Sequence, residues 1–338
     1  MSRVAVVILN FNGRHLLEKF LPSVIRFTAG ARVIVADNGS SDDSLALVRS
    51  QFPDVGIIPI PTNLGFCGGY NFAMQQVQSE YAILLNSDVE VTAGWADPVI
   101  KLLDEQKDVA AAQPKILSYN HRDHFEYAGA AGGHIDELGY PFCRGRIFDF
   151  IEKDNHQYDD SHQIFWATGA CMFIRTELFN KLGGFDEDFF AHMEEIDLCW
   201  RLKRSNFRIF YVAQSTVYHV GGATLARGSS RKVYFNFRNA MYLVIKHLPG
   251  AELLWKLPVR VMLDWLAAFV FLFGYPSATW AVLQAHVSVL GTLGKMINKR
   301  RKLKLTMSPD RVHGIFPGSV VWRFFVLQRK TYSSLGDQ

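Results

Sequence analysis

The chain has 338 residues, a formal net charge of +4 and an isoelectric point near 8.8. This length accommodates one large domain, or one domain with a substantial appendage, and the charge is too weakly basic to indicate a nucleic-acid partner. A mean hydropathy of +0.04 and an aromatic content of 13% are high for a freely soluble enzyme and indicate contact with a membrane surface.

The first third of the chain predicts a parallel sheet. Short apolar runs, each long enough for one strand, alternate there with amphipathic segments typical of helices. The runs cover residues 4–9, 33–36, 55–60, 81–85 and 109–112. Continuous apolar strands separated by helices are typical of a sheet covered on both faces, so we expect an α/β fold.

The middle of the chain has a less regular pattern. Residues 115–165 lack clear periodicity, and we expect long loops or a small irregular sheet there. Beyond them the pattern predicts a strand, two helices and two more short strands. These cover residues 165–174, 175–182, 193–205, 208–212 and 217–219.

The composition changes in the last third of the chain. Residues 265–294 include no Asp, Glu, Lys or Arg, but Gly-Tyr-Pro at 274–276 interrupts this run. Charged residues punctuate the apolar stretch before it, as in a helix that lies in a membrane interface. They are Lys256, Arg260 and Asp264. We expect a helical, membrane-associating region, with a true span or a buried helical pair as the alternatives.

Two acidic residues follow apolar runs of the expected sheet. Asp37 comes directly after the second run, and Asp88 lies just beyond the fourth. In open α/β sheets, ligands bind outside the carboxyl ends of the strands. The carboxylate of Asp37 can accept a hydrogen bond from the N–H of a uracil or thymine ring. The alternative is a helix-capping aspartate in a turn.

Asn86, Ser87 and Asp88 form a degenerate Asp-x-Asp sequence. Hard oxygen ligands suit Mg²⁺ or Mn²⁺, which would neutralise the diphosphate of a sugar nucleotide. Asp88 is the expected direct ligand, while Asn86 can supply only a neutral oxygen or contact the ribose. His219 precedes two glycines, and for it a packed core histidine and a metal or phosphate contact are equally open.

Residues 63–71 are rich in glycine and open a helix, which suits close approach of the backbone to a phosphate. The segment is neither a Walker A loop nor a dinucleotide-binding fingerprint. It therefore argues against a P-loop NTPase and against a dehydrogenase.

Three carboxylates lie at the start of the helix expected from residue 193. Glu194 and Asp197 share one face of that helix, and Glu195 lies beside them. Acidic residues at this position can also simply complement the helix dipole. Phe190 and Trp200 nearby can desolvate a carboxylate and raise its pKa toward the working range of a base, which favours a catalytic role.

Taken in order, these segments resemble the family 2 inverting glycosyltransferases of GT-A fold, especially the bacterial rhamnosyltransferase-like branch. The resemblance covers about residues 4–240, and its specificity comes from the order of the motifs. The matching segments are residues 7–13, 37–42, 63–71, 85–88, 169–170, 183–186 and 194–201. The resemblance implies a mostly parallel sheet flanked by helices, with a catalytic domain at residues 1–240 and an appendage at 241–338.

The resemblance also implies roles for individual residues. Asp37 would bind the nucleotide base and Asp88 the metal, with His219 helping to hold the ion. Further contacts to the nucleotide sugar would come from Asn10, Asn12, Asn38, Asn63, Gly65, Asn71, Asn86 and Ser87. Contacts to the acceptor would come from Trp166, Gly169 and Ala170.

The catalytic Glu-Asp pair of the family falls on Glu194 and Glu195. Glu195 would then be the base, although the family has aspartate at this position. The extra methylene moves the carboxylate by about an ångström, and a shift of this size can be costly. Glu194 and Asp197 are therefore the alternatives for the base.

The sequence thus predicts a metal-dependent inverting glycosyltransferase that uses a UDP- or dTDP-sugar together with Mg²⁺ or Mn²⁺. The expected acceptor is a lipid-linked saccharide in surface polysaccharide biosynthesis. Widely spaced cysteines without metal-site spacing indicate a reducing compartment. The expected location is therefore the cytoplasmic face of the cell membrane, with peripheral or monotopic attachment.

Two other functions remain open. A sugar-phosphate nucleotidyltransferase would need a Gly-rich loop with a basic residue just after the first strand, and residues 10–13 lack that pattern. A non-catalytic protein that binds nucleotide sugars is the second alternative, because Glu195 departs from the family's aspartate.

Overall fold

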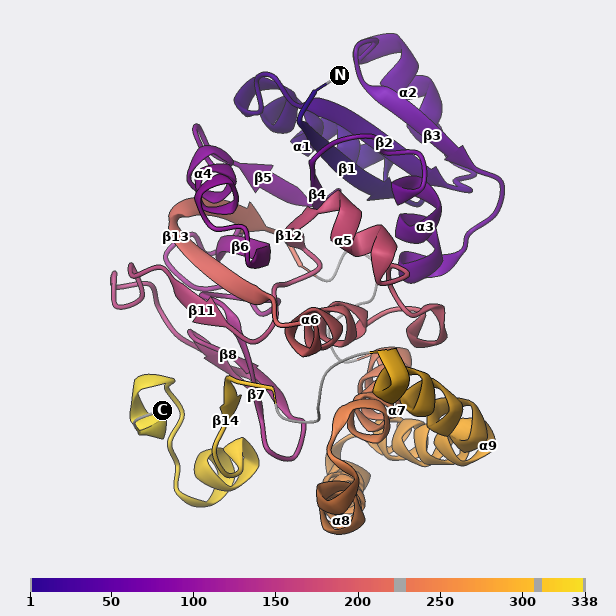
Figure 1. The fold of residues 1–338 in the computed structure, drawn as a ribbon, viewed down its shortest axis with the longest axis vertical. Coiled ribbons are helices and arrows are strands. Elements are labelled where there is room, and N and C mark those ends of the chain that lie inside the picture. The colour runs from indigo at the N-terminus through magenta and orange to yellow at the C-terminus, as the bar shows by residue number, and fades with distance from the viewer. Residues whose placement is uncertain (1, 222–228, 307–311, 337–338) are drawn as a thin grey trace.

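The fold is built on a mixed sheet whose central strands are parallel (Figure 1). The computed structural model describes residues 2–221, 229–306 and 312–336. In spatial order the strands are β11 (His162–Ile164), β13 (Arg208–His219), β6 (Val109–Ser118), β12 (Cys171–Arg175), β4 (Tyr81–Asn86), β1 (Val4–Asn10), β2 (Arg32–Asn38) and β3 (Gly56–Ile60), and β5 (Val89–Val91) pairs with β13. The pairs from β4 to β3 and the β6–β13 pair are parallel, whereas β12, β11 and β5 join antiparallel.

Helices cover both faces of this sheet. One face packs against α1 (Arg14–Phe27), α2 (Ser44–Gln51) and α4 (Asp97–Glu105). The other packs against α3 (Gly65–Met74), α5 (Thr176–Lys181) and α6 (Glu194–Arg204). Alternate side chains of each strand point to opposite cores, as the strand period requires. The expected α/β fold is confirmed, although its sheet is more mixed than mostly parallel.

Two strand predictions are wrong in detail. The strand expected over residues 165–174 begins only at Cys171, because the preceding segment turns toward a second sheet. There the amide of Phe165 donates to the carbonyl of Gly133 at 2.8 Å. The two short strands expected after residue 207 form a single strand, β13, with shifts of register along its length.

A small second sheet forms in the region where long loops or a small irregular sheet were expected. Its strands, in spatial order, are β10 (Phe150–Ile151), β9 (Arg146–Ile147), β8 (Pro141–Cys143), β7 (Gly133–Asp136) and β14 (Ile315–Phe316). Strand β14 comes from the C-terminal part of the chain and lies parallel to β7. The last part of the chain therefore returns to the body of the molecule.

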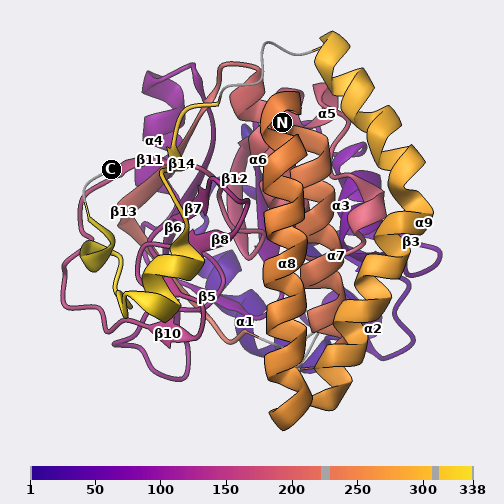
Figure 2. The same ribbon diagram turned by 90° about the horizontal axis from the view of Figure 1, so that it is seen from below.

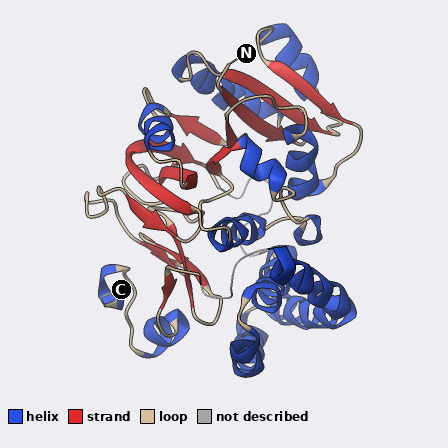
Figure 3. Ribbon diagram, viewed as in Figure 1, coloured by secondary structure: helices blue, strands red, loops and turns tan. Residues whose placement is uncertain are grey.

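Helices α7 (Ser230–His247), α8 (Gly250–Gly274) and α9 (Pro276–Thr306) pack together beside the two sheets (Figures 2 and 3). The interruption expected at residues 274–276 separates α8 from α9. The boundary expected at residue 240 falls inside α7, so this helix runs through both expected parts of the chain.

Helix α8 carries its charged side chains inward and its apolar side chains outward. Lys256, Arg260 and Asp264 recur every four residues and are buried. Arg260 donates to Asp264 at 3.1 Å, and Tyr140 and His286 contact the same carboxylate at 3.3 Å. The exposed residues of α8 include Leu254, Trp255, Met262, Trp265, Leu266, Phe269, Val270, Leu272 and Phe273. The charges that the sequence suggested for a membrane interface thus face the protein, which is a correction.

By length and composition α8 could cross a membrane, and it is the one such helix in the ranges that the structure describes. Its outward face is apolar, whereas a surface helix in water normally turns its polar face outward. The buried charged side chains of α8 form hydrogen bonds and ion pairs within the protein. The outer face of α8 therefore presents apolar side chains to its surroundings.

Candidate active site

The carboxyl ends of β1, β2 and β4 form one edge of the sheet, where several expected nucleotide-binding side chains meet. Asn10 lies opposite Asp37 in the register of β1 and β2. Asn86 ends β4, on the other side of β1. Asp37 is buried and accepts hydrogen bonds from Asn10 Nδ2 at 2.9 Å and from the amide of Ser40 at 3.1 Å. Its carboxylate is thus fixed by β1 and by the turn after β2.

Asn10 keeps one polar atom available for a ligand. Within the described part of the chain, its buried Oδ1 atom has no hydrogen-bond partner. A Cβ atom at Gly13 would lie 2.6 Å from this oxygen and 3.7 Å from Ser87 Oγ, so glycine keeps the space between them open. An unpaired buried acceptor is costly. A ligand with an N–H or O–H group can satisfy it here.

Asn12, Asn38 and Asn63 fix the loops around this edge. Asn12 Oδ1 accepts a hydrogen bond from the amide of Ser41 at 2.8 Å. Asn38 Nδ2 donates to Asn63 Oδ1 at 3.1 Å and to the carbonyl of Gly65 at 3.0 Å. The loop at residues 63–71 therefore lies against the end of β2, as expected, but Asn38 and Asn63 use much of their hydrogen-bonding capacity to hold it there.

Asp88 lies in the tight turn between β4 and β5, and His219 ends β13 opposite the start of β5. Asp88 Oδ1 is 3.1 Å from His219 Nε2, and its Oδ2 accepts from the amide of Gly221 at 3.2 Å. On the other side of the ring, His219 Nδ1 is 3.1 Å from Glu126 Oε2. Burial lowers the pKa of His219, but the two carboxylates outweigh it and raise the pKa to about 10. The structure thus brings the two expected metal ligands together.

This pair fits a divalent cation as part of a shared coordination shell once the cation displaces the proton between Asp88 Oδ1 and His219 Nε2, because only a neutral imidazole binds a metal. Carboxylate oxygen suits Mg²⁺ and Mn²⁺, and a carboxylate behind the ring commonly orients a metal-binding histidine. Within residues 2–221, 229–306 and 312–336, no group of three or more His, Cys, Asp or Glu side chains is placed to hold a metal alone. A cation at Asp88 and His219 would therefore need further oxygen ligands from water or from a diphosphate.

Glu194 and Glu195 begin α6 and carry carboxyl oxygens that are available for chemistry. Among the described residues, the buried Oε2 atoms of both lack a hydrogen-bond partner. Burial raises the pKa of Glu195 to about 7. Burial, reinforced by the charge on Glu195, raises the pKa of Glu194 well above its ordinary value. The pKa of Glu195 is thus suited to proton exchange near neutral pH.

A strained loop leads into α6. Phe190, His192 and Met193 have positive φ angles of 64°, 68° and 69°, which are uncommon for residues with a side chain. Asn239 of α7 holds this loop, because its Nδ2 atom donates to three of the loop's carbonyl groups at 3.0, 2.9 and 2.7 Å. The ring of Phe190 packs on Gly65, where a Cβ atom would lie 2.7 Å away. Helix α7 and residues 63–71 together position the start of α6.

Asp197, the third expected acid, has a different environment. Its buried carboxylate lies 2.9 Å from Arg201 Nε, 2.5 Å from Lys246 Nζ and 2.8 Å from His247 Nε2. Burial raises its pKa, but the neighbouring cations outweigh it and hold the pKa well below the ordinary value. A carboxylate held in this way is a poor proton acceptor. The geometry therefore corrects the expectation of Asp197 as an alternative base and favours an ion-pairing role.

Gly169 and Ala170 lie between the nucleotide-binding edge at the end of β4 and the glutamates at the start of α6. The carbonyl of Ala170 accepts from the amide of Asn86 at 3.0 Å. A Cβ atom at Gly169 would lie 3.8 Å from Glu194 Oε1, so this segment passes between the end of β4 and the start of α6. Trp166, expected beside them, lies in the core, and its Nε1 donates to a main-chain carbonyl of β7 at 2.8 Å. Two of the three expected acceptor residues therefore reach the site.

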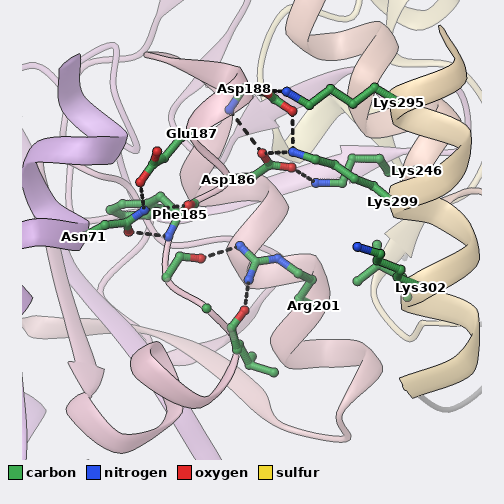
Figure 4. A pocket seen from close by; sticks show the side chains of 14 residues that line it. Asn71, Phe185, Asp186, Glu187, Asp188, Arg201, Lys246, Lys295, Lys299 and Lys302 are labelled. Carbon is green, nitrogen blue, oxygen red and sulfur yellow. Dashed lines mark hydrogen bonds and ion pairs between the residues drawn. The ribbon is translucent and has the colours of Figure 1, made fainter. Parts of the chain in front are cut away.

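Asn71 lies away from this edge, at a separate pocket of about 500 Å³ (Figure 4). Its side chain donates to the carbonyl of Phe185 at 2.9 Å and accepts from the amide of the same residue at 2.8 Å. Three lysines of α7 and α9 form ion pairs with two aspartates in this pocket: Lys246, Lys295 and Lys299 with Asp186 and Asp188. Asn71 thus holds the turn after α5 rather than a nucleotide.

The sequence interpretation missed Glu126 and Asn239. Asn239 follows Arg238 on a helix that carries a second amide, Asn236, so the sequence pattern did not distinguish it. Glu126 lies in the segment without periodicity, so no pattern linked it to His219.

Comparison with known proteins gives consistent matches. A family model described as "Glycosyl transferase family 2" matches residues 5–183. The N-acetylglucosaminyl-diphospho-decaprenol L-rhamnosyltransferase of Mycobacterium tuberculosis is 25% identical over 308 residues, which are 86% of this chain and 93% of that protein. The rhamnosyltransferase WbbL of Escherichia coli is 25% identical over 224 residues, which are 64% of this chain and 83% of that protein.

A solved structure shares the fold. GalNAc-T7, crystallised with UDP, GalNAc and Mn²⁺, superposes with a TM-score of 0.55 and 16% identity. The match covers 74% of this chain and 49% of that chain. At this level of identity the likeness concerns the fold alone.

Proposed function

The chain belongs to glycosyl transferase family 2 and has the GT-A fold, and we propose that it is a metal-dependent inverting glycosyltransferase. That it is a glycosyltransferase follows from the family and its named relatives. The donor would be a UDP- or dTDP-sugar, and the acceptor would be a hydroxyl group of a lipid-linked saccharide.

The donor would bind at the carboxyl ends of β1, β2 and β4. Asp37 can accept a hydrogen bond from the N–H of a uracil or thymine ring, and the unpaired Oδ1 of Asn10 offers a further acceptor. Ser87 Oγ lies across the space that Gly13 leaves open. The fold neighbour crystallised with UDP supports this donor class.

Asp88 and His219 would hold Mg²⁺ or Mn²⁺ beside the diphosphate, with Glu126 orienting the histidine. A bound cation would stabilise the negative charge that develops on the leaving diphosphate. The Mn²⁺ in the structure of GalNAc-T7 supports a divalent ion in this fold.

Glu195 would act as the base. Its carboxylate takes the proton of the acceptor hydroxyl, and the hydroxyl oxygen forms a bond to the anomeric carbon of the donor sugar. The bond from that carbon to the diphosphate oxygen breaks, and its electron pair leaves with the diphosphate. A single displacement of this kind inverts the anomeric configuration. A base with a pKa near 7 is suited to neutral pH.

The acceptor would be presented at a membrane. The apolar outer face of α8 supports attachment there, and one relative is named for a decaprenol-linked substrate. The four cysteines are free and buried, which agrees with a reducing compartment and hence with the cytoplasmic face. Peripheral or monotopic attachment remains a prediction.

The observation that carries the proposal is the buried Oε2 atom of Glu195, which has no hydrogen-bond partner among the described residues, at the start of the helix whose Glu194 lies beside Gly169. To test it, full-length protein in detergent is incubated with UDP- and dTDP-sugars, with Mn²⁺, Mg²⁺ or EDTA. We expect metal-dependent release of nucleoside diphosphate that increases with a lipid-linked saccharide. Release of pyrophosphate from sugar phosphate and nucleoside triphosphate would instead identify a nucleotidyltransferase. Binding of donors without turnover would contradict the catalytic assignment.

A further inference from the structure

The segment after β14 forms a small apolar tip on the surface. Trp322–Val326 make one wide helical turn, and Leu327 follows. Trp322 and Phe325 are 58% and 56% exposed, and Val326 and Leu327 are 53% and 48% exposed. We call these four residues the apolar tip. Large apolar side chains exposed as a contiguous group mark an interaction surface.

Neighbouring residues of the same segment anchor the apolar tip to the body of the protein. The ring of Phe324, which lies between the exposed residues in sequence, packs on Phe148 with 5.0 Å between centroids. The guanidinium of Arg323 donates to the carbonyl of Leu335, and the amide of Val320 donates to a buried carboxylate at the end of β7 at 2.9 Å. The ring of Phe325 also contacts Phe148, with 5.0 Å between centroids, and remains more than half exposed. The exposed side chains therefore belong to an anchored segment and are not part of a loose end.

The apolar tip lies at the same end of the molecule as α8. In Figure 1 both α8 and the yellow turn after β14 occupy the lower end, and Figure 2, viewed from below, shows both toward the viewer. Arg329 and Lys330 follow the tip and are exposed. Cations beside an apolar surface complement the anionic headgroups of a bilayer.

We propose that the apolar tip is a second membrane-inserting element, which enters the interface of an anionic bilayer alongside the outer face of α8. This inference rests on the proposed membrane attachment through α8. Aromatic side chains such as Trp322 and Phe325 favour the membrane–water interface, and an apolar group flanked by basic residues is typical of interfacial insertion. Two separate contacts fix the tilt of the catalytic domain over the membrane, whereas a single helix leaves rotation about its axis free.

Site-specific fluorescence tests the insertion directly. All four native cysteines are buried, so a new surface cysteine can be labelled selectively with an environment-sensitive fluorophore. Val326→Cys reports on the apolar tip, Val270→Cys on α8, and Ile25→Cys on α1 serves as a control at another exposed apolar position. Each labelled full-length protein is mixed with vesicles of phosphatidylcholine and phosphatidylglycerol that contain a lipid-borne quencher.

We expect a blue shift and lipid quenching at positions 326 and 270, and neither at position 25. A response at 270 without one at 326 would overturn the second contact while leaving attachment through α8 intact. No response at either position would overturn both. A spectral change at 326 that grows with protein concentration in the absence of vesicles would show that the tip contacts a second copy of the chain instead.

Charge substitutions give an independent readout. Phe325→Glu should weaken partitioning into these vesicles by about 10- to 100-fold, the loss expected when one large apolar side chain stays in water. Ile25→Glu should have little effect. The double variant Arg329→Gln/Lys330→Gln should weaken binding to anionic vesicles more than binding to pure phosphatidylcholine. Unchanged partitioning of Phe325→Glu would contradict the proposal. Metal-dependent donor hydrolysis in detergent should remain in all of these variants, which separates this test from that of the catalytic assignment.

Discussion

His247 Nε2 lies 2.8 Å from Asp197 Oδ1, and both side chains are completely buried. Lys246 and Arg201 contact the same carboxylate. This contact joins α7 to α6, the helix that begins with the two glutamates of the site. The position of those glutamates therefore depends on an ion-pair cluster that does not take part in proton transfer.

Asp197→Asn should destabilise the protein by about 3–5 kcal/mol, because it removes the counter-charge of buried Arg201 and one of the two carboxylates that pair with Lys246, the other being Asp186. Urea unfolding at neutral pH measures the loss, and exposed Asp54→Asn is the matched control. The folded-state pKa of Asp197 lies below its unfolded value. The stabilisation is therefore present above the unfolded pKa and is lost as the pH falls through the folded one. Normal stability combined with abolished turnover would instead return Asp197 to the list of candidate bases.

Glu195→Gln should lower kcat by about 10²–10⁴-fold with little change in donor affinity, because it keeps the shape of the side chain and removes proton acceptance. With the parent enzyme, kcat should rise with pH through about 7, as the Glu195 carboxyl group loses its proton. The variant should lack this limb of the profile. If Glu194→Gln abolishes turnover and Glu195→Gln does not, the base is Glu194.

Asp88→Asn should abolish metal-dependent turnover while leaving the fold intact, because the substitution removes the anionic oxygen beside His219. Titration of activity with Mn²⁺ and Mg²⁺ before and after EDTA treatment measures the effect. Asp54→Asn again provides the control. A parent enzyme that is indifferent to EDTA would refute the metal role.

Asn239→Ala should reduce kcat by about 10- to 100-fold and leave the KM for the donor nearly unchanged. The substitution removes three hydrogen bonds that hold the strained loop before Glu194, and small displacements of a catalytic group are costly. Asn236→Ala on the same helix is the control. Equal losses in both variants would mean that the effect comes from α7 as a whole and not from the loop contacts.

Much of the proposed donor site, at the carboxyl ends of β1, β2 and β4, could be predicted because short stretches of sequence specify it. Short apolar runs placed β1, β2 and β4, and the acids that follow them fell at one edge of the sheet. The environment of Asp197 could not be predicted, because its partners Lys246 and His247 come from a helix about 50 residues away in sequence. Sequence alone placed three similar carboxylates on one helix, and only tertiary contacts distinguish the ion-paired one.

The orientation of helix α8 is a second feature that the sequence alone could not predict. Its pattern of charged and apolar residues indicated correctly that the helix is amphipathic, and the interruption after it was found. Which side faces outward depends on Tyr140 and His286, which satisfy Asp264 from separate segments. Periodicity defines two faces of a helix, but it does not state which of them meets the protein.

The pairing of β14 with β7 has a consequence for how the protein folds. Val320 donates to Asp136 across 184 residues of sequence, so the second sheet is completed only when the last part of the chain has been synthesised. Contacts of such long range form slowly. The apolar helices α8 and α9 leave the ribosome before β14, while β7 still lacks its neighbour. An intermediate that exposes both the apolar helices and the unpaired edge of β7 is prone to aggregate. Synthesis close to a bilayer shortens the time for which the helices and this edge are both uncovered.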